Sequence, residues 1–260
     1  MTQEMGLASI EELMDRAWPA PDREDTGGWV MRAAGGVTQR ANSVWPREQA
    51  SDHESAVRAA TQWYRSRRLP LIFQIFDDER SAGLNRVLDA QRFTRQSETL
   101  IMVRPGGALP AALPGGPATG VEISEEPSEE WLRLWWSVDG RGGDAELDIA
   151  RRILVSCPSV YALAKDDDGV PAAVGRLALV GGKGGIYCMA TAAKHRRRGY
   201  GRQVLEALLE AGAHRGVSEF WLLVTASNTG ARTLYDGAGF AEHGRYLYRQ
   251  ARPQRALSGC

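Results

Sequence analysis

Three arginines stand directly before a glycine–x–glycine turn in the C-terminal half of the chain. Arg196, Arg197 and Arg198 precede Gly199-Tyr200-Gly201, and apolar residues at helical spacing follow at Val204, Leu205, Leu208 and Leu209. This spacing predicts a helix that begins at about Gly201. Glycines let a ligand approach main-chain N–H groups closely, and the first N–H groups of a helix have no partners within it. The stretch therefore predicts a phosphate site, and Lys194 and His195 add to the local positive charge.

Two common phosphate-binding patterns do not fit this stretch. The dinucleotide fingerprint G-x-G-x-x-G would need glycine at position 204, where the chain has Val204, and the pattern G-x-x-x-x-G-K-[ST] does not occur. The basic run from Lys194 to Arg198 could instead be an exposed patch for RNA, with an affinity that falls steeply with salt. The turn and helix start that follow the run favour phosphate binding.

The motif Arg196-x-x-Gly199-x-Gly201 continues downstream with Asn228, Ala231, Leu234-Tyr235 and Gly239-Phe240. Together these residues resemble the GNAT superfamily of N-acetyltransferases, over roughly the last half of the chain. The resemblance implies an acetyl-CoA cosubstrate whose pyrophosphate binds at the Arg-Gly bend. Family members often carry Pro three residues before the first arginine, where this chain has Ala193. We expect that change to affect the rigidity of the loop more than its chemistry.

The same resemblance implies a gap between two strands, at 186–191 and 219–225, that admits the pantetheine arm. Cys188 is expected to point the other way from Met189 and Thr191. We interpret it as a structural thiol rather than a nucleophile. Asn228 is expected to cap a helix as well as to contact the cosubstrate. The residues expected at acetyl-CoA are Met189, Ala190, Thr191, Arg196, Arg197, Arg198, Gly199, Tyr200, Gly201, Arg202, Asn228, Ala231 and Tyr235.

Tyr235 is the residue expected to do acid chemistry. In the family, a tyrosine here protonates the departing thiolate, and such help typically contributes about 10²–10⁴-fold to a rate. The alternative is a buried core tyrosine whose hydroxyl already has a partner. The general base follows from no motif, and Asp139, Glu146 and Glu219 all stay open as candidates. A main-chain N–H on the parted strand is expected to stabilise the thioester oxygen.

Three tryptophans mark the region expected to line the acceptor side. Trp131, Trp135 and Trp136 precede a loop at Gly140–Gly143. Trp131 and Trp135 share the apolar face of a helix at 127–138 and are expected in the core. Trp136 lies off that face and is the candidate for contact with the acceptor.

Composition limits the classes of partner. The 260 residues carry 32 Lys and Arg against 32 Asp and Glu, so no global attraction to nucleic acid or to an anionic membrane is expected. No apolar run of about 18 residues predicts a membrane span. The three cysteines indicate a reducing, cytoplasmic location without disulfides, and no Cys/His spacing suits a metal. The acceptor is expected to be a small-molecule or peptide amine, and the protein a monomer or homodimer.

The order of predicted elements indicates a duplication. The N-terminal part reads as a helix at 8–18 capped by Ser9, strands at 29–32 and 38–45, a helix from 51 or 52 to 67, a strand at 69–76, a helix at 81–90 and a strand at 98–103. The order from strand to strand recurs later, and Leu88–Phe93 can be laid over Tyr235–Phe240. We therefore expect two tandem GNAT-like α/β domains with mixed sheets: a degenerate copy at 1–104, a Pro/Gly/Ala linker at 105–119 and a catalytic copy at 120–252.

The N-terminal copy is expected to have lost its chemistry. It has no glycine–x–glycine turn, and Leu88 occupies the place of Tyr235. We expect it to pack against the catalytic copy and to shape the substrate cleft. For the whole chain the predicted function is acetyl transfer to a primary amine by direct attack in a ternary complex. A non-catalytic acyl-CoA sensor or scaffold of the same fold is the alternative.

Overall fold

The computed structural model describes residues 6–96, 98–106 and 120–252. The chain forms two compact units. The first combines Met1–Pro19 with Leu100–His243, and the second combines Ala20–Thr99 with Gly244–Cys260, as far as these ranges are described. The boundaries of these units therefore differ from the domain boundaries at 104 and 120 that the sequence suggested. The predicted linker lies outside the described residues apart from its first two, of which Pro105 ends strand β6 (Thr99–Pro105).

The first unit is built on a mixed sheet. Its strands are β7 (Val121–Ser124), β8 (Ser159–Lys165), β9 (Pro171–Val180), β10 (Lys183–Thr191) and β11 (Glu219–Thr225), and β6 lies beside β11. Strands β7 to β10 pair antiparallel, whereas β10 and β11 pair parallel. The parallel pair needs a crossover, which helix α6 (Tyr200–His214) supplies. The mixed-sheet α/β class is thus confirmed.

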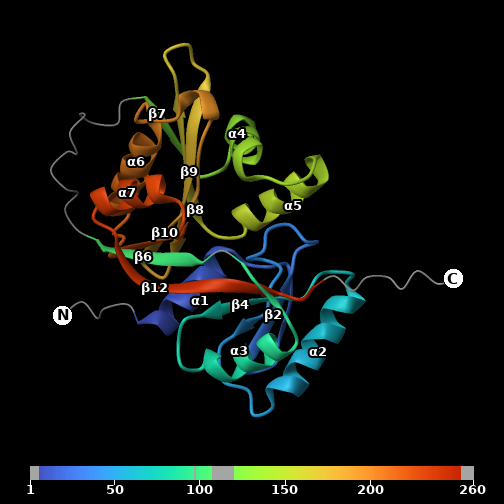
Figure 1. Cartoon of the computed structure of the whole chain (residues 1–260). Helices are drawn as coiled ribbons and strands as arrows, with labels where there is room; N and C mark the ends of the chain where they lie inside the picture. The colour runs from blue at the N-terminus through green and yellow to red at the C-terminus, as the bar shows by residue number, and fades with distance from the viewer. Residues whose placement is uncertain (1–5, 97, 107–119, 253–260) are drawn as a thin grey trace. The chain divides into compact units, whose positions relative to one another are not determined.

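Helices cover both faces of this sheet. Figure 1 shows α6 and α7 (Thr229–Gly237) on one face and α4 (Glu129–Asp139) and α5 (Asp144–Val155) on the other. The predicted apolar stripe of α6 is buried in the core, from Val204 to Leu209. Trp131 and Trp135 of α4 are 1% and 4% exposed, which confirms their place in the core.

Helix α1 (Leu7–Ala17) belongs to the first unit although it opens the chain. The Arg176 guanidinium on β9 is fully buried, and its Nη1 donates to Ala17 O at 3.0 Å. Trp18 stacks on Tyr187 of β10, with 5.6 Å between the ring centroids. The helix begins one residue after Gly6, so Ser9 is not its N-cap. No local signal in the sequence could assign this helix to strand β9, since Arg176 and Ala17 are 159 residues apart.

The second unit contains a small antiparallel sheet and a second set of strands. The small sheet is ordered β1 (Asp22–Asp25), β2 (Trp29–Ala33), β3 (Trp45–Pro46). Strand β12 (Ala241–Gln250) pairs antiparallel with β4 (Ile72–Phe76) and β5 (Thr94–Arg95). Helices α2 (His53–Ser66) and α3 (Ser81–Ala90) lie where they were predicted, and Asp52 caps α2.

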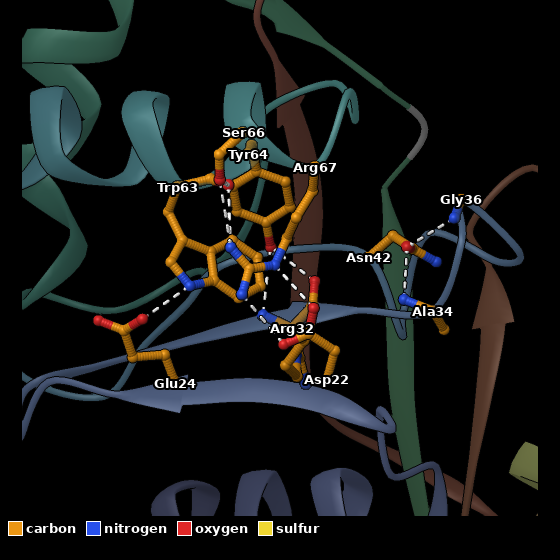
Figure 2. Close-up of polar contacts among 10 residues, drawn as sticks. All are labelled: Asp22, Glu24, Arg32, Ala34, Gly36, Asn42, Trp63, Tyr64, Ser66 and Arg67. Carbon is orange, nitrogen blue, oxygen red and sulfur yellow. Dashed lines mark hydrogen bonds and ion pairs between the residues drawn. The ribbon is translucent and has the colours of Figure 1, made fainter.

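The predicted strand at 38–45 is wrong, because most of that stretch is a folded loop. Asn42 holds the loop: its Oδ1 accepts from the N–H groups of Ala34 and Gly36 (Figure 2). Its Nδ2 donates to Val37 O and Thr38 O. Thr38 has a φ of 63°, which a strand does not allow. A buried amide that satisfies four main-chain groups outweighs the strand propensity of the flanking residues.

The two segments that suggested a duplication end their helices in the same way. In α3, Phe93 N donates to Leu88 O at 2.9 Å, and Arg92 has a φ of 58°. In α7, Phe240 N donates to Tyr235 O at 3.0 Å, and the residue before it, Gly239, has a φ of 84°. In both segments a residue with left-handed backbone conformation ends the helix, and the hydrogen bond from the next residue closes a six-residue turn. Leu88 is fully buried, in agreement with a core role for this counterpart of Tyr235.

Candidate active site

The bend before α6 presents main-chain N–H groups without partners. Gly199 is the N-cap, with a φ of 89°, and Arg197 has a φ of 60°. Within the described part of the chain, the N–H groups of Gly199, Tyr200 and Gly201 donate no hydrogen bond. A methyl group on Gly201 would come within 3.2 Å of Thr191 Oγ1, so glycine at this position lets the bend pack closely against the end of β10. The bend is a concave set of donors at a helix start, which suits a phosphate oxygen.

The three arginines before the bend are not held in ion pairs with carboxylates of the described chain. Among the described residues, Arg196, Arg197 and Arg198 form no ion pair with a carboxylate, and Arg196 Nε only approaches Thr191 O at 3.5 Å. Arg202 faces Glu206 at 3.5 Å. His195, expected to add to this field, is buried instead, and its Nε2 lies 2.9 Å from Asp166 Oδ2. The arginines therefore supply the positive charge at the bend, whereas His195 holds the bend in place through its contact with Asp166.

Strands β10 and β11 separate next to the bend. Their pairing ends at Ile186 and Leu222, although β10 continues to Thr191 and β11 to Thr225. A bulge accompanies the separation: two residues, Cys188 and Met189, lie between the β10 positions that pair with Arg176 and Val174 of β9. Cys188 has a φ of 54° and is half-buried. Regular alternation, on which its expected direction rested, is interrupted at this point.

A cavity of about 540 Å³ is lined by the bend, the end of β10 and α7. It is lined by all the residues predicted to bind acetyl-CoA except Arg198: Met189, Ala190, Thr191, Arg196, Arg197, Gly199, Tyr200, Gly201, Arg202, Asn228, Ala231 and Tyr235. Val138, Asp139, His195, Gly230 and Leu234 complete the lining. Cys188 and Trp136 are not among the described lining residues.

Tyr235 is held in the cavity wall by α7. It is 6% exposed, and its ring meets Phe240 edge-on at 6.2 Å between centroids. Within the described chain its hydroxyl makes no hydrogen bond, whereas Tyr161 Oη donates to Leu154 O at 3.0 Å. Burial raises the pKa of Tyr235 to about 12, and the charge of Asp139 adds to the rise. Tyr235 thus differs from a core tyrosine such as Tyr161 in that its hydroxyl proton is not committed to a hydrogen bond.

Helix α7 begins at a cap that also faces the cavity. Asn228 Oδ1 accepts from Ala231 N at 3.1 Å, which confirms the predicted capping role. The same residue lines the cavity. Capping therefore fixes its side chain beside the space where a ligand would lie.

The three carboxylates that the sequence left open lie in different surroundings. Glu146 Oε2 accepts from Gly143 N at 2.8 Å and so caps α5. Glu219 is ion-paired with Lys183. Asp139 alone of the three lines the cavity, where it is exposed to solvent. Partial desolvation raises its pKa against the lowering effects of the Trp135 indole and of Arg196. Trp136 bonds instead to its own loop, donating from Nε1 to Gly142 O at 3.2 Å.

The described residues offer neither a metal centre nor a membrane span. No three His, Cys, Asp or Glu side chains in the described ranges are grouped so that they could hold a metal ion. The helices in those ranges are too short or too polar to cross a lipid bilayer.

Known proteins resemble this chain along almost its full length. The family model described as "Probable histone acetyltransferase Rv0428c C-terminal" matches residues 6–249. The "Uncharacterized N-acetyltransferase YobR" of Bacillus subtilis is 27% identical over 245 residues, which cover 94% of this chain and 98% of the relative.

Solved structures agree on the fold. A GCN5-related N-acetyltransferase from Kribbella flavida superposes with a TM-score of 0.69 at 20% identity, covering 98% of this chain and 99% of the other. A tandem GNAT protein from the clavulanic acid biosynthesis pathway has a TM-score of 0.65 at 12% identity, covering 97% of this chain and 90% of that one. The tandem architecture inferred from the repeated order of elements is therefore a known form of this fold.

Proposed function

The chain belongs to the GNAT family of N-acetyltransferases, and from that membership we propose that it transfers an acetyl group from acetyl-CoA to a primary amine. The amine attacks directly in a ternary complex, without a covalent acyl-enzyme. Cys188, the thiol nearest the site in sequence, is not among the described residues that line the cavity, which supports the direct route.

The residues present fit acetyl-CoA. The pyrophosphate would be held by the free N–H groups at 199–201 and by the arginines beside them. The unpaired edges of β10 and β11 offer main-chain groups to the amide groups of the pantetheine arm. When bound, acetyl-CoA supplies the activated acetyl group, while the protein holds both reactants and manages protons.

One observation carries the proposal: the partnerless hydroxyl of Tyr235 lies in the same cavity as the anion-binding bend. A phenol with a pKa of about 12 keeps its proton at neutral pH and can give it to the departing sulfur. A non-catalytic sensor would need the bend but would have no use for an uncommitted acid.

The test is coenzyme A release from acetyl-CoA with a panel of primary amines: an alkylamine, a polyamine, an aminosugar and a peptide with a free N-terminus. Tyr235→Phe is expected to lower turnover with a responsive amine by about 10²–10⁴-fold, while acetyl-CoA affinity persists. Tyr161→Phe is the matched control, because its lost hydrogen bond costs about 1 kcal/mol of stability and leaves turnover in place.

Two results would count against the enzyme. Unchanged turnover in Tyr235→Phe would remove the tyrosine from the chemistry. Wild-type protein that binds acetyl-CoA in calorimetry but releases no coenzyme A with any amine would favour the sensor.

A further inference from the structure

Resting on the proposed acetyl transfer, we propose that Asp139 is the general base that takes the proton from the attacking ammonium. Primary alkylamines are almost fully protonated at neutral pH, because their pKa lies near that of lysine, about 10.4. A nitrogen without a lone pair cannot attack, so the site needs a proton acceptor beside the acetyl group.

The cavity provides one carboxylate for this task. Asp139 is the last residue of α4, and both it and Val138 reach the cavity that contains Tyr235. Among the described lining residues, Asp139 is the one with an acidic side chain. Helix α4 thus ends at the cavity that the end of β10, the bend and α7 also line.

The other two candidates are already used elsewhere. The carboxylate of Glu146 holds the first turn of α5, where Gly143 N donates to it. The carboxylate of Glu219 is paired with Lys183 at the start of β10 and β11, near the strand ends opposite to the cavity. Neither of them lines the cavity.

The surroundings of Asp139 suit a base. Asp139 is exposed to solvent, as a group that passes a proton outward must be. Partial desolvation by its neighbours still raises the pKa of its carboxyl, which makes the carboxylate a stronger proton acceptor, while Trp135 and Arg196 favour the charged form. The ionisable groups that face the same cavity are Arg196, Arg197, Arg202, His195, Tyr200 and Tyr235, from the bend, from η1 (Ala193–His195), from α6 and from α7. The positive groups among them favour an ionised Asp139.

The proton balance links the two ends of the reaction. Asp139 takes one proton from the ammonium, the amine nitrogen bonds to the carbonyl carbon, and the carbon–sulfur bond breaks. Tyr235 gives its proton to the sulfur and regains one from the nitrogen, so that one proton leaves through Asp139 in each turnover. Because the charge of Asp139 raises the pKa of Tyr235, protonation of Asp139 makes Tyr235 a stronger acid as the sulfur departs.

The experiment compares Asp139→Asn with wild type on two amines. One is the alkylamine from the panel that gives the highest turnover, and the other is hydroxylamine, which is largely uncharged at pH 7. We expect turnover of the alkylamine to fall by about 10²–10⁴-fold and that of hydroxylamine by less than about 10-fold. In the wild-type pH profile of kcat/KM for the alkylamine, the acidic limb should report protonation of Asp139. In the variant this limb should move toward the pKa of the amine, about 10.4, because only the unprotonated amine can then react.

Three controls separate this role from a structural one. Asp148→Asn, an exposed position on α5, is expected to keep wild-type rates on both amines. Asp139→Glu is expected to restore part of the alkylamine rate. Calorimetry with coenzyme A should give Asp139→Asn an affinity within about 3-fold of wild type, because the bend is intact.

Two outcomes would overturn the assignment. Equal losses on both amines, or an acidic limb that stays at the wild-type pH in Asp139→Asn, would exclude Asp139 as the base and leave the proposed transfer standing. No release of coenzyme A by wild-type protein with any amine would overturn the proposed function itself, and the base with it.

Discussion

His195 Nε2 lies 2.9 Å from Asp166 Oδ2, and this contact ties the bend before α6 to the turn between β8 and β9. The turn is itself closed around Asp166, whose main chain accepts from Gly169 N and whose Oδ1 accepts from Val170 N. The bend therefore rests on a rigid turn from a different part of the chain, which helps to hold its N–H groups in position.

Asp166→Asn should destabilise the protein in a pH-dependent way. The pKa of Asp166 is lowered, first by the Val170 N–H and also by His195, against the effect of burial. A carboxyl whose folded pKa is depressed stabilises the fold above its ordinary pKa and loses that contribution as pH falls through the folded value. The melting temperature of Asp166→Asn should be below that of wild type at pH 7, and the gap should narrow below about pH 4.

Asp168→Asn, in the same turn and exposed, is the control and should melt like wild type at both pH values. A gap for Asp166→Asn that stays constant down to pH 2.5 would mean that its charge does not stabilise the fold.

Gly199→Ala should impair ligand binding beyond its effect on stability. Gly199 and Gly216 flank α6, with φ of 89° and 74°, and neither has a neighbour within 4 Å of an added methyl group. Alanine at either position should cost about 1–2 kcal/mol in urea unfolding, because left-handed backbone disfavours a side chain. Only Gly199→Ala should weaken coenzyme A in calorimetry, since its methyl group would lie among the free N–H groups. Equal affinities in the two variants would place the ligand elsewhere.

Asn228→Ala tests the double use of a helix cap. Loss of the cap on α7 should cost about 1 kcal/mol, as should loss of the Ser128 cap on α4, where Ser128 Oγ accepts from Trp131 N. Coenzyme A affinity should decrease in Asn228→Ala and remain in Ser128→Ala, since Ser128 does not line the cavity. If both variants bound alike, Asn228 would be a cap and nothing more.

The high pKa of Tyr235 can be measured as the absence of a titration. With a pKa of about 12, its phenolate should not form below pH 10. Wild type and Tyr235→Phe should therefore show the same phenolate absorbance up to that pH, with circular dichroism to verify that both stay folded. A phenolate that forms below pH 10 in wild type and is missing from the variant would contradict the buried, acid form of Tyr235.

Local patterns predicted most of the first unit. The glycines at 199 and 201, the stripe of α6 and the cap at Asn228 each depend on residues only a few positions apart. The bulge in β10 was not predicted, because Cys188 and Met189 carry no local signal for a φ of 54° in the middle of a strand. Gly175 of β9 lies opposite the bulge, and a methyl group on it would lie 2.6 Å from Met189 Sδ, so this glycine leaves room for the Met189 side chain.

Long-range pairing explains the remaining differences. Strand β12 pairs with β4, about 170 residues earlier, so unit boundaries cannot be read from positions along the chain. The sequence left Asp139 as one of three candidates for the general base, because the position of a residue on a helix does not show which other elements pack near the end of that helix. Its selection required the cavity, to which α4, the bend and α7 all contribute.

The separation of β10 from β11 beyond Ile186 has a consequence for the lifetime of the protein. Without ligand, the inter-strand hydrogen bonds between β10 and β11 are missing beyond Ile186, and the amides there are open to solvent exchange and to local opening. An acyl donor bound there as proposed would supply hydrogen-bond partners at those positions, and the stability of the folded form would then rise with the logarithm of the donor concentration. Supply of the donor would then govern how long each copy survives proteolysis as well as how fast it works.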